Sequence, residues 1–108
     1  MTVTHALPEE VAASTRQPSW TFLTNHAHVL LTLALDPELR IRDVAVKVGI
    51  TERAAQRILH DLVEAGYVAR QRHGRRNTYR LALELPLRHP LESRHTVGEL
   101  VDLLCASR

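Results

Sequence analysis

Half of the chain's basic residues lie between positions 51 and 80, and all of them are arginines: Arg53, Arg57, Arg70, Arg72, Arg75, Arg76 and Arg80. Three acidic residues accompany them, so this block carries a balance of +4, whereas the rest of the chain sums to −2. Guanidinium groups bind phosphates and pair bidentately with guanine edges. A chain whose excess positive charge lies in one such block has the charge distribution of a polyanion-binding protein.

Within this block, four side chains that can hydrogen-bond to bases recur at helical spacing. Arg53, Gln56, Arg57 and His60 lie three or four residues apart, so on a helix they project from one side. Arginine and glutamine can pair bidentately with guanine and adenine. Thr51 precedes them, and its hydroxyl can cap a helix whose first amides can hold a phosphate. The spacing predicts a helix over about residues 51–65 whose exposed side is built from hydrogen-bonding groups.

The basic side chains that follow lie in a segment that predicts a β-hairpin. Two extended stretches, at about 68–73 and 78–83, flank a turn that contains Gly74. The predicted tip covers residues 73–77, and a hairpin tip projects from the body of a domain. We expect four residues of this hairpin to contact DNA: Arg72, His73, Arg75 and Arg76.

Three further helical patterns predict the elements that position these groups. The apolar run from Val29 to Leu35 follows capping candidates at positions 24 and 25 and ends before Pro37, which predicts a buried helix. Helical spacing from Ile41 onward stops at Gly49, a residue that commonly ends helices. Thr96 and Glu99 form the capping-box pattern T-x-x-E before a last helix.

The last helix is short, and so short a helix is marginal in isolation. Its apolar stripe must therefore pack either on the first helix of its own chain or on a second copy of the protein. The homodimer is the sharper interpretation, and it predicts a dimerisation surface made of Trp20, Phe22, Val97, Leu100, Val101 and Leu104.

Length and composition bound the organisation of the chain. Its 108 residues suffice for one modest core but not for two. We expect a flexible N-terminal arm over residues 1–19, a DNA-binding domain over 20–84, and a connector with a C-terminal helix over 85–108. No apolar run reaches the length of a membrane span and no secretion signal is evident, so we expect a cytoplasmic protein without a membrane partner.

Several chemistries find little support among the residue types. The single Cys105 excludes an internal disulfide and a cysteine metal cluster. The chain has seven histidines, but His26 and His28 lie two apart on a predicted helix and point in different directions. His60 and Asp61 are adjacent on a predicted helix, so their side chains also point in different directions. They therefore cannot form a catalytic set with Thr51 as the nucleophile. We expect no enzyme activity, no metal and no cofactor.

The order of helix, short helix, tight turn, helix and hairpin resembles the winged helix-turn-helix proteins of bacterial transcription, particularly the MarR and ArsR groupings. The resemblance covers about residues 20–83, and its most telling stretch is "IRDVAVKVGITERAAQRILHDLVEAGYVARQRHGRRNTYRL". Core and turn residues of the family match this chain at Val44, Ala45, Val48, Gly49, Ile50, Ala55, Leu59, Leu62, Gly66, Tyr67 and Val68.

The resemblance implies a mainly α fold with a small β-hairpin (α+β): a winged helix-turn-helix domain with an added C-terminal helix. It also implies a sequence-specific transcriptional regulator that binds double-stranded DNA, with the third helix in the major groove and the wing at the minor groove. The full MarR pattern adds longer terminal helices that form a dimer and a ligand pocket, and this chain has little room for them, so an effector stays unassigned. Cysteine-based metal sensing of the ArsR kind is not expected from Cys105 alone.

Two other functions stay open. The winged-helix scaffold can serve as a protein-interaction module without direct DNA binding, because a fold does not determine a function. Single-stranded RNA binding is a weaker alternative, since the arginine-rich block has no aromatic platform on which bases could stack.

Overall fold

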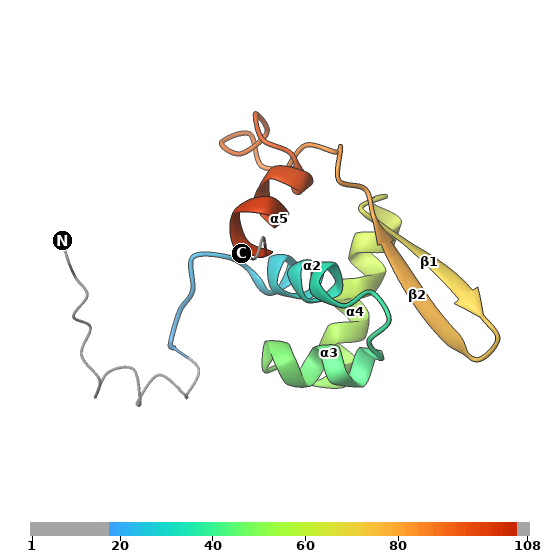
Figure 1. Cartoon of the computed structure of the whole chain (residues 1–108). Helices are drawn as coiled ribbons and strands as arrows, with labels where there is room; N and C mark the ends of the chain where they lie inside the picture. The colour runs from blue at the N-terminus through green and yellow to red at the C-terminus, as the bar shows by residue number, and fades with distance from the viewer. Residues whose placement is uncertain (1–17, 106–108) are drawn as a thin grey trace.

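The structure is a computed structural model that describes residues 18–105. In chain order, this part contains α2 (Asn25–Leu35), α3 (Ile41–Val48), α4 (Glu52–Glu64), β1 (Val68–His73), β2 (Arg76–Leu81) and α5 (Val97–Cys105). Four helices and an antiparallel hairpin confirm the predicted mainly α fold with a small β-hairpin (Figure 1). The predicted arm over residues 1–19 lies outside the described residues except for its last two.

Helix α2 lies at the centre of the domain and contacts α3, α4, α5 and the hairpin (Figure 1). The Thr24 hydroxyl accepts a hydrogen bond from the amide of Ala27 at 3.3 Å and so caps its start. Val29 and Leu33 are fully buried, which agrees with the nearly all-apolar run in the sequence. Within residues 18–105 no helix combines the length and the apolar character that crossing a bilayer requires.

A tight turn joins α3 to α4 and sets the geometry of the helix-turn-helix. Gly49 takes a φ of 89°, a left-handed conformation that a side chain would strain, and its amide donates to the carbonyl of Ala45 at 2.8 Å. Thr51 then caps α4, because its Oγ1 accepts from the amide of Ala54 at 3.0 Å. The chain can therefore reverse within three residues and present α4 beside α3.

The hairpin is tighter than the sequence predicts. The second strand begins at Arg76 rather than at residue 78 and ends at Leu81, and His73 pairs with Arg76 across a two-residue turn. Gly74 has a φ of 62°, and glycine at the first central position is typical of the type II′ turn that matches strand twist. The predicted tip of five residues is therefore wrong, and Arg76 lies in a strand.

The loop between α2 and α3 anchors the hairpin to the body. The amide of Tyr79 donates to the carbonyl of Pro37 at 3.1 Å, along the outer edge of β2. The Arg76 guanidinium donates to the carbonyl of Glu38 at 3.1 Å. Tyr79 is buried in the core, so the base of the hairpin is fixed at one edge and by packing.

The connector after β2 doubles back on itself before α5 begins. Pro86 and Thr96 form an isolated antiparallel bridge, and the amide of Leu87 donates to the carbonyl of His95 at 2.9 Å. The predicted capping box is present: the amide of Thr96 donates to Glu99 Oε1 at 2.8 Å, and the amide of Glu99 donates to Thr96 Oγ1 at 3.1 Å. The hydrogen bond from Thr96, aided by His95, lowers the pKa of Glu99.

Candidate nucleic-acid interface

One face of α4 is buried and the other carries the predicted base-reading groups. Its buried side chains belong to Ala55, Ile58, Leu59 and Leu62, which pack on α2 and α3. The structure leaves all four candidates on the opposite side exposed: Arg53, Gln56, Arg57 and His60. The amphipathic spacing thus produces a helix with donors and acceptors on its solvent face, as the geometry of a major groove requires.

Thr51 performs a structural task at the start of this helix. Its hydroxyl oxygen accepts from the helix itself, while the hydroxyl proton is free to be donated outward. The unpaired amides of the first turn and the positive end of the helix dipole lie beside it. This helix terminus can therefore receive a phosphate oxygen.

The hairpin candidates differ in how their guanidinium groups are used. Arg75 lies in the two-residue turn, at the tip of the hairpin. Arg76 is held by the carbonyl of Glu38, and the Nε of Arg72 donates to the carbonyl of Gly74 at 2.9 Å. His73 is exposed opposite Arg76. The four predicted wing residues are all exposed, but two of them already donate to backbone carbonyls.

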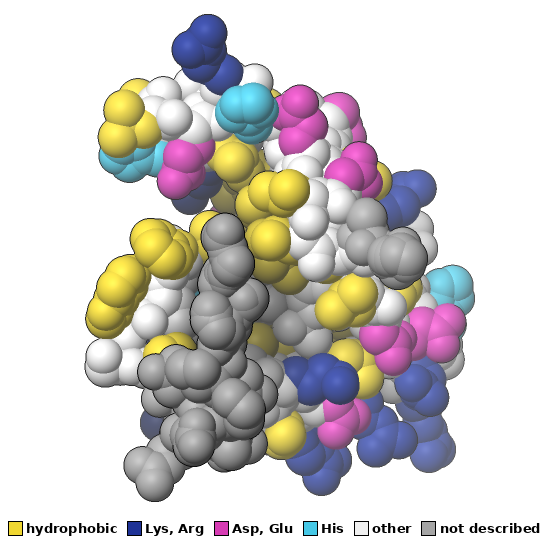
Figure 2. Space-filling view, turned by 60° about the vertical axis from the view of Figure 1, so that its left-hand side comes forward, with side chains coloured by type: hydrophobic (Ala, Val, Ile, Leu, Met, Phe, Trp, Pro, Cys, Tyr) yellow, Lys and Arg dark blue, Asp and Glu magenta, His cyan; other side chains and the backbone are white. Residues whose placement is uncertain are grey.

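The start of α4 and the tip of the hairpin lie at the same end of the molecule, opposite α5 and the connector (Figure 1). Lys and Arg side chains gather at the lower end of the molecule in Figure 2. Helix α3 adds exposed Arg42 and Lys47, which lie outside the arginine-rich block and were not predicted as site residues. The sequence could have indicated Arg42 and Lys47 as candidates, because the first helix of a helix-turn-helix crosses the DNA backbone.

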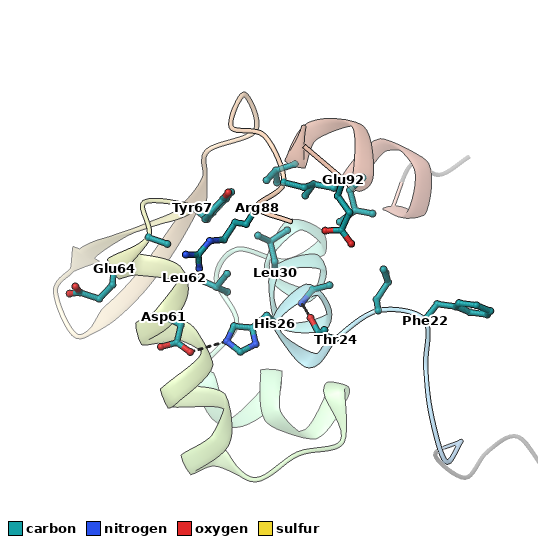
Figure 3. A pocket seen from close by; sticks show the side chains of 16 residues that line it. Phe22, Thr24, His26, Leu30, Asp61, Leu62, Glu64, Tyr67, Arg88 and Glu92 are labelled. Atoms are coloured by element: carbon teal, nitrogen blue, oxygen red, sulfur yellow. Dashed lines mark hydrogen bonds and ion pairs between the residues drawn. The ribbon is translucent and has the colours of Figure 1, made fainter. Parts of the chain in front are cut away.

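A cavity of about 690 Å³ lies at the other end, between α2, the end of α4, the connector and α5 (Figure 3). At its edge, His26 Nε2 donates to Asp61 Oδ2 at 2.8 Å and links α2 to α4. This hydrogen bond, together with the positive charge of neighbouring side chains, holds the pKa of Asp61 below its ordinary value. Sequence reasoning missed the cavity, because its walls come from segments far apart in the chain.

The candidate dimerisation residues fall into buried and exposed groups. Val97 is 1% exposed and belongs to the core of its own chain, and Val101 packs against that core. Leu104, in contrast, is half exposed. Trp20 and Phe22 are 67% and 92% exposed, and their rings meet edge to face with centroids 5.0 Å apart. Leu100 is half-buried and lines the cavity described above.

Metal-ligating side chains do not converge in the described part of the chain. Between residues 18 and 105, no three histidine, cysteine, aspartate or glutamate side chains lie together in a group that could hold a metal ion. His26 donates to Asp61, whereas His28 Nδ1 donates to Asn25 Oδ1 at 3.1 Å. The two histidines of α2 thus have different hydrogen-bond partners.

The chain is similar to one family of known proteins and to solved structures. The model of the MarR family matches residues 21–76. The MarR family protein Rv2887 of Mycobacterium tuberculosis, solved in complex with salicylic acid, is 31% identical over 56% of this chain and 47% of that chain, with a TM-score of 0.47. The PcaV transcriptional regulator of Streptomyces coelicolor, in complex with its natural ligand, is 25% identical over 73% of this chain and 63% of that chain, with a TM-score of 0.49.

This chain therefore spans between about half and two thirds of the length of these two structures. No curated protein matches it.

Proposed function

This chain belongs to the MarR family of winged-helix transcriptional regulators, and on that premise we propose that it binds duplex DNA in a sequence-specific manner. One observation carries the proposal. The exposed face of α4 carries four side chains that can hydrogen-bond to base edges, those of Arg53, Gln56, Arg57 and His60, and the helix starts at the same end of the molecule as the arginine-bearing hairpin tip (Figure 1). A single duplex can therefore contact both features.

In this proposal α4 lies in the major groove. The groove is about 12 Å wide and admits one helix. Arg53 and Arg57 pair with guanine edges, and Gln56 pairs with adenine, while His60 contacts a base or a phosphate further along the helix. Thr51 and the first amides of α4 hold a backbone phosphate and fix the register of the helix on the duplex.

The hairpin serves as the wing in the adjacent minor groove. Arg75 is placed at the tip, where it can enter a narrow, A·T-rich minor groove with strong negative potential. His73 and Arg72 lie beside it and approach the flanking phosphates. Arg76 supports the wing from the strand, because its guanidinium donates to the carbonyl of Glu38.

A homodimer is the assembly that suits this surface. The exposed members of the predicted dimerisation surface are Trp20, Phe22 and Leu104, and Leu103, next to Leu104 in sequence, is 77% exposed. A two-fold dimer of helix-turn-helix proteins reads half-sites about one helical turn apart. The operator would then be an inverted repeat, and the protein would work in the cytoplasm beside the chromosome.

The cavity between α2, α4 and α5 is the best place for a small-molecule effector. Its volume of about 690 Å³ lies within the range of ligand pockets, and it combines apolar walls with a few polar groups. Asp61, whose pKa is shifted, lies on the helix proposed to read DNA. A ligand at this position can therefore act on α4 directly.

The test of DNA binding is fluorescence anisotropy with labelled duplexes over a series of salt concentrations. Affinity should fall as salt rises. Replacing Arg53 or Arg57 by alanine should cost about 1 to 3 kcal/mol of binding free energy and relax specificity at the guanine that it contacts, whereas replacing Arg75 should lower the slope of log affinity against log salt by about 0.9. The matched control replaces Arg88 and Arg94, which lie on the connector at the opposite end, and should keep the slope. Affinity that is insensitive to salt rejects the proposal.

A protein-interaction module is the second candidate, and the exposed apolar side chains near the two ends of the described chain favour it. A pull-down with and without nuclease separates the two. A partner that docks directly on the protein survives removal of nucleic acid, whereas one that is held through DNA is released.

A further inference from the structure

The pairing of the two strands assigns each arginine of the hairpin to one of two faces. Side chains alternate between the faces of a strand, and residues directly opposite each other in an antiparallel pair share a face. Val68 pairs with Leu81, and Arg70 pairs with Tyr79. Val68 and Tyr79 are 3% and 7% exposed and belong to the hydrophobic core. Arg70 therefore lies on the face that is turned toward the helical body, called the body face below.

Arg80 leaves the hairpin on the opposite face. It pairs with Ala69, and both residues are exposed. Arg76 lies four residues earlier on the same strand, so it shares this outer face. Arg70 and Arg80 thus belong to adjacent residue pairs of the ladder, with the same side chain and opposite directions.

The guanidinium of Arg70 is not engaged by the rest of the described chain. Arg70 is exposed, and within residues 18–105 its side chain makes no hydrogen bond and no ion pair. Arg72 lies on the same face two residues closer to the tip, but its Nε donates to the carbonyl of Gly74. The charge of Arg70 is therefore available to an anion from outside the chain.

The body face lies along the path of a duplex that reaches both α4 and the hairpin tip. In Figure 1 the strands leave the body near the end of α4 and run outward to the tip, which lies at the same end of the molecule as the start of α4. One sugar–phosphate strand separates a major groove from the adjacent minor groove. With α4 in the first groove and the tip in the second, that strand lies between them, on the α4 side of the hairpin. Its phosphates face Arg70, whereas Arg80 points away from them.

We propose that Arg70 is a further DNA-contacting residue, which neutralises a phosphate of the strand between the two grooves, and that Arg80 makes no such contact. The inference rests on the duplex binding proposed above and adds the face of the hairpin that meets the DNA. A guanidinium can donate two parallel hydrogen bonds to one phosphate. A contact of this kind positions the wing relative to α4 and carries no sequence information.

The experiment compares Arg70→Gln with its matched control Arg80→Gln, on the full chain, by fluorescence anisotropy over a series of salt concentrations. A labelled duplex of mixed sequence serves as the probe, because phosphate contacts do not depend on sequence. Arg70→Gln should lower the slope of log affinity against log salt by about 0.9 for each bound protomer, whereas Arg80→Gln should change it by less than about 0.3. Arg70→Lys keeps the positive charge and should restore most of the slope.

Equal losses of slope in the two glutamine variants, or a larger loss for Arg80→Gln, would overturn the inference. An Arg70→Lys variant with the slope of Arg70→Gln would also overturn it, because the charge would then not explain the effect. Thermal unfolding shows that the variants remain folded, and a merely structural role of Arg70 would lower the Tm without moving the slope. A parent whose affinity is insensitive to salt rejects duplex binding itself, whereas a salt-dependent parent with an unchanged slope in Arg70→Gln rejects only the inference.

Discussion

Arg75 and Arg76 are neighbours in sequence, yet the structure predicts that replacing each by alanine has a different effect on DNA binding. Arg75 lies in the turn at the hairpin tip, whereas the Arg76 guanidinium donates to the carbonyl of Glu38 at 3.1 Å. Arg75→Ala should remove one phosphate or minor-groove contact and lower the salt slope by about 0.9. Between about 50 and 200 mM salt, that interaction accounts for roughly a threefold to fourfold change in affinity.

Arg76→Ala should weaken binding by another route. Without its hydrogen bond to Glu38 the hairpin loosens against the α2–α3 loop, at a cost of about 0.5 to 1.5 kcal/mol, so affinity should fall roughly twofold to twelvefold. The salt slope should change by less than about 0.3, because the charge that is removed does not touch DNA. Anisotropy titrations at several salt concentrations, with Arg94→Ala as a control, measure both quantities. Equal reductions of slope for Arg75→Ala and Arg76→Ala would refute this division of roles.

Three further predictions concern the stability of the domain. Thr51→Ala should lower the free energy of unfolding in urea by about 1 kcal/mol, because α4 is then without its cap. The hydrogen bond between His26 and Asp61 lowers the pKa of Asp61, so its contribution to the free energy of unfolding is present above the ordinary pKa of 3.8 and is lost as the pH falls through the lowered value. The difference in the free energy of unfolding between the parent and Asp61→Asn should therefore shrink over that acid range. Gly98→Ala should destabilise by on the order of 1 kcal/mol, since a Cβ there would lie 3.0 Å from the carbonyl oxygen of Leu83.

Each of these predictions has a result that would contradict it. A Thr51→Ala variant as stable as the parent would show that the cap contributes nothing. A parent-to-variant difference that grows toward acid pH would reverse the sign assigned to Asp61. A Gly98→Ala variant of higher stability would mean that helix propensity outweighs the close approach to Leu83, and thermal unfolding would detect it.

Local signals in the sequence sufficed for the helices and their ends. Thr24, Thr51 and the pair of Thr96 and Glu99 cap helices in the structure as their side-chain chemistry predicts. Gly49 takes the left-handed conformation that ends α3. These features depend on groups within four residues of one another, and a sequence displays such neighbours directly.

The hairpin register and the partner of α5 depend on contacts that the sequence does not display. Asn77 has the chemistry of a turn residue, but it pairs with Arg72 in the ladder because Gly74 closes a two-residue turn. Val97 belongs to an apolar stripe that is equally suited to its own core and to a second copy, and in the structure it is buried in its own core. Periodicity identifies an apolar face and leaves its partner undetermined.

The cavity and its edge were the least accessible to sequence reasoning. His26 and Asp61 are 35 residues apart, and their hydrogen bond forms only because α2 packs beside α4. No spacing rule joins two such positions. A site that assembles from four segments needs the fold before it can be recognised.

The proposed function gives the two ends of α4 separate tasks. Its early turns carry Arg53 and Arg57 toward solvent, while its last turn supplies Asp61, Leu62 and Glu64 to the wall of the cavity. In the proposed function, substitutions that alter which bases are preferred can therefore accumulate without changing which effector binds the cavity, and the reverse also holds. Protein engineers could therefore change either the base preference or the effector by substituting a few residues of α4, on one side or the other of the boundary between His60 and Asp61.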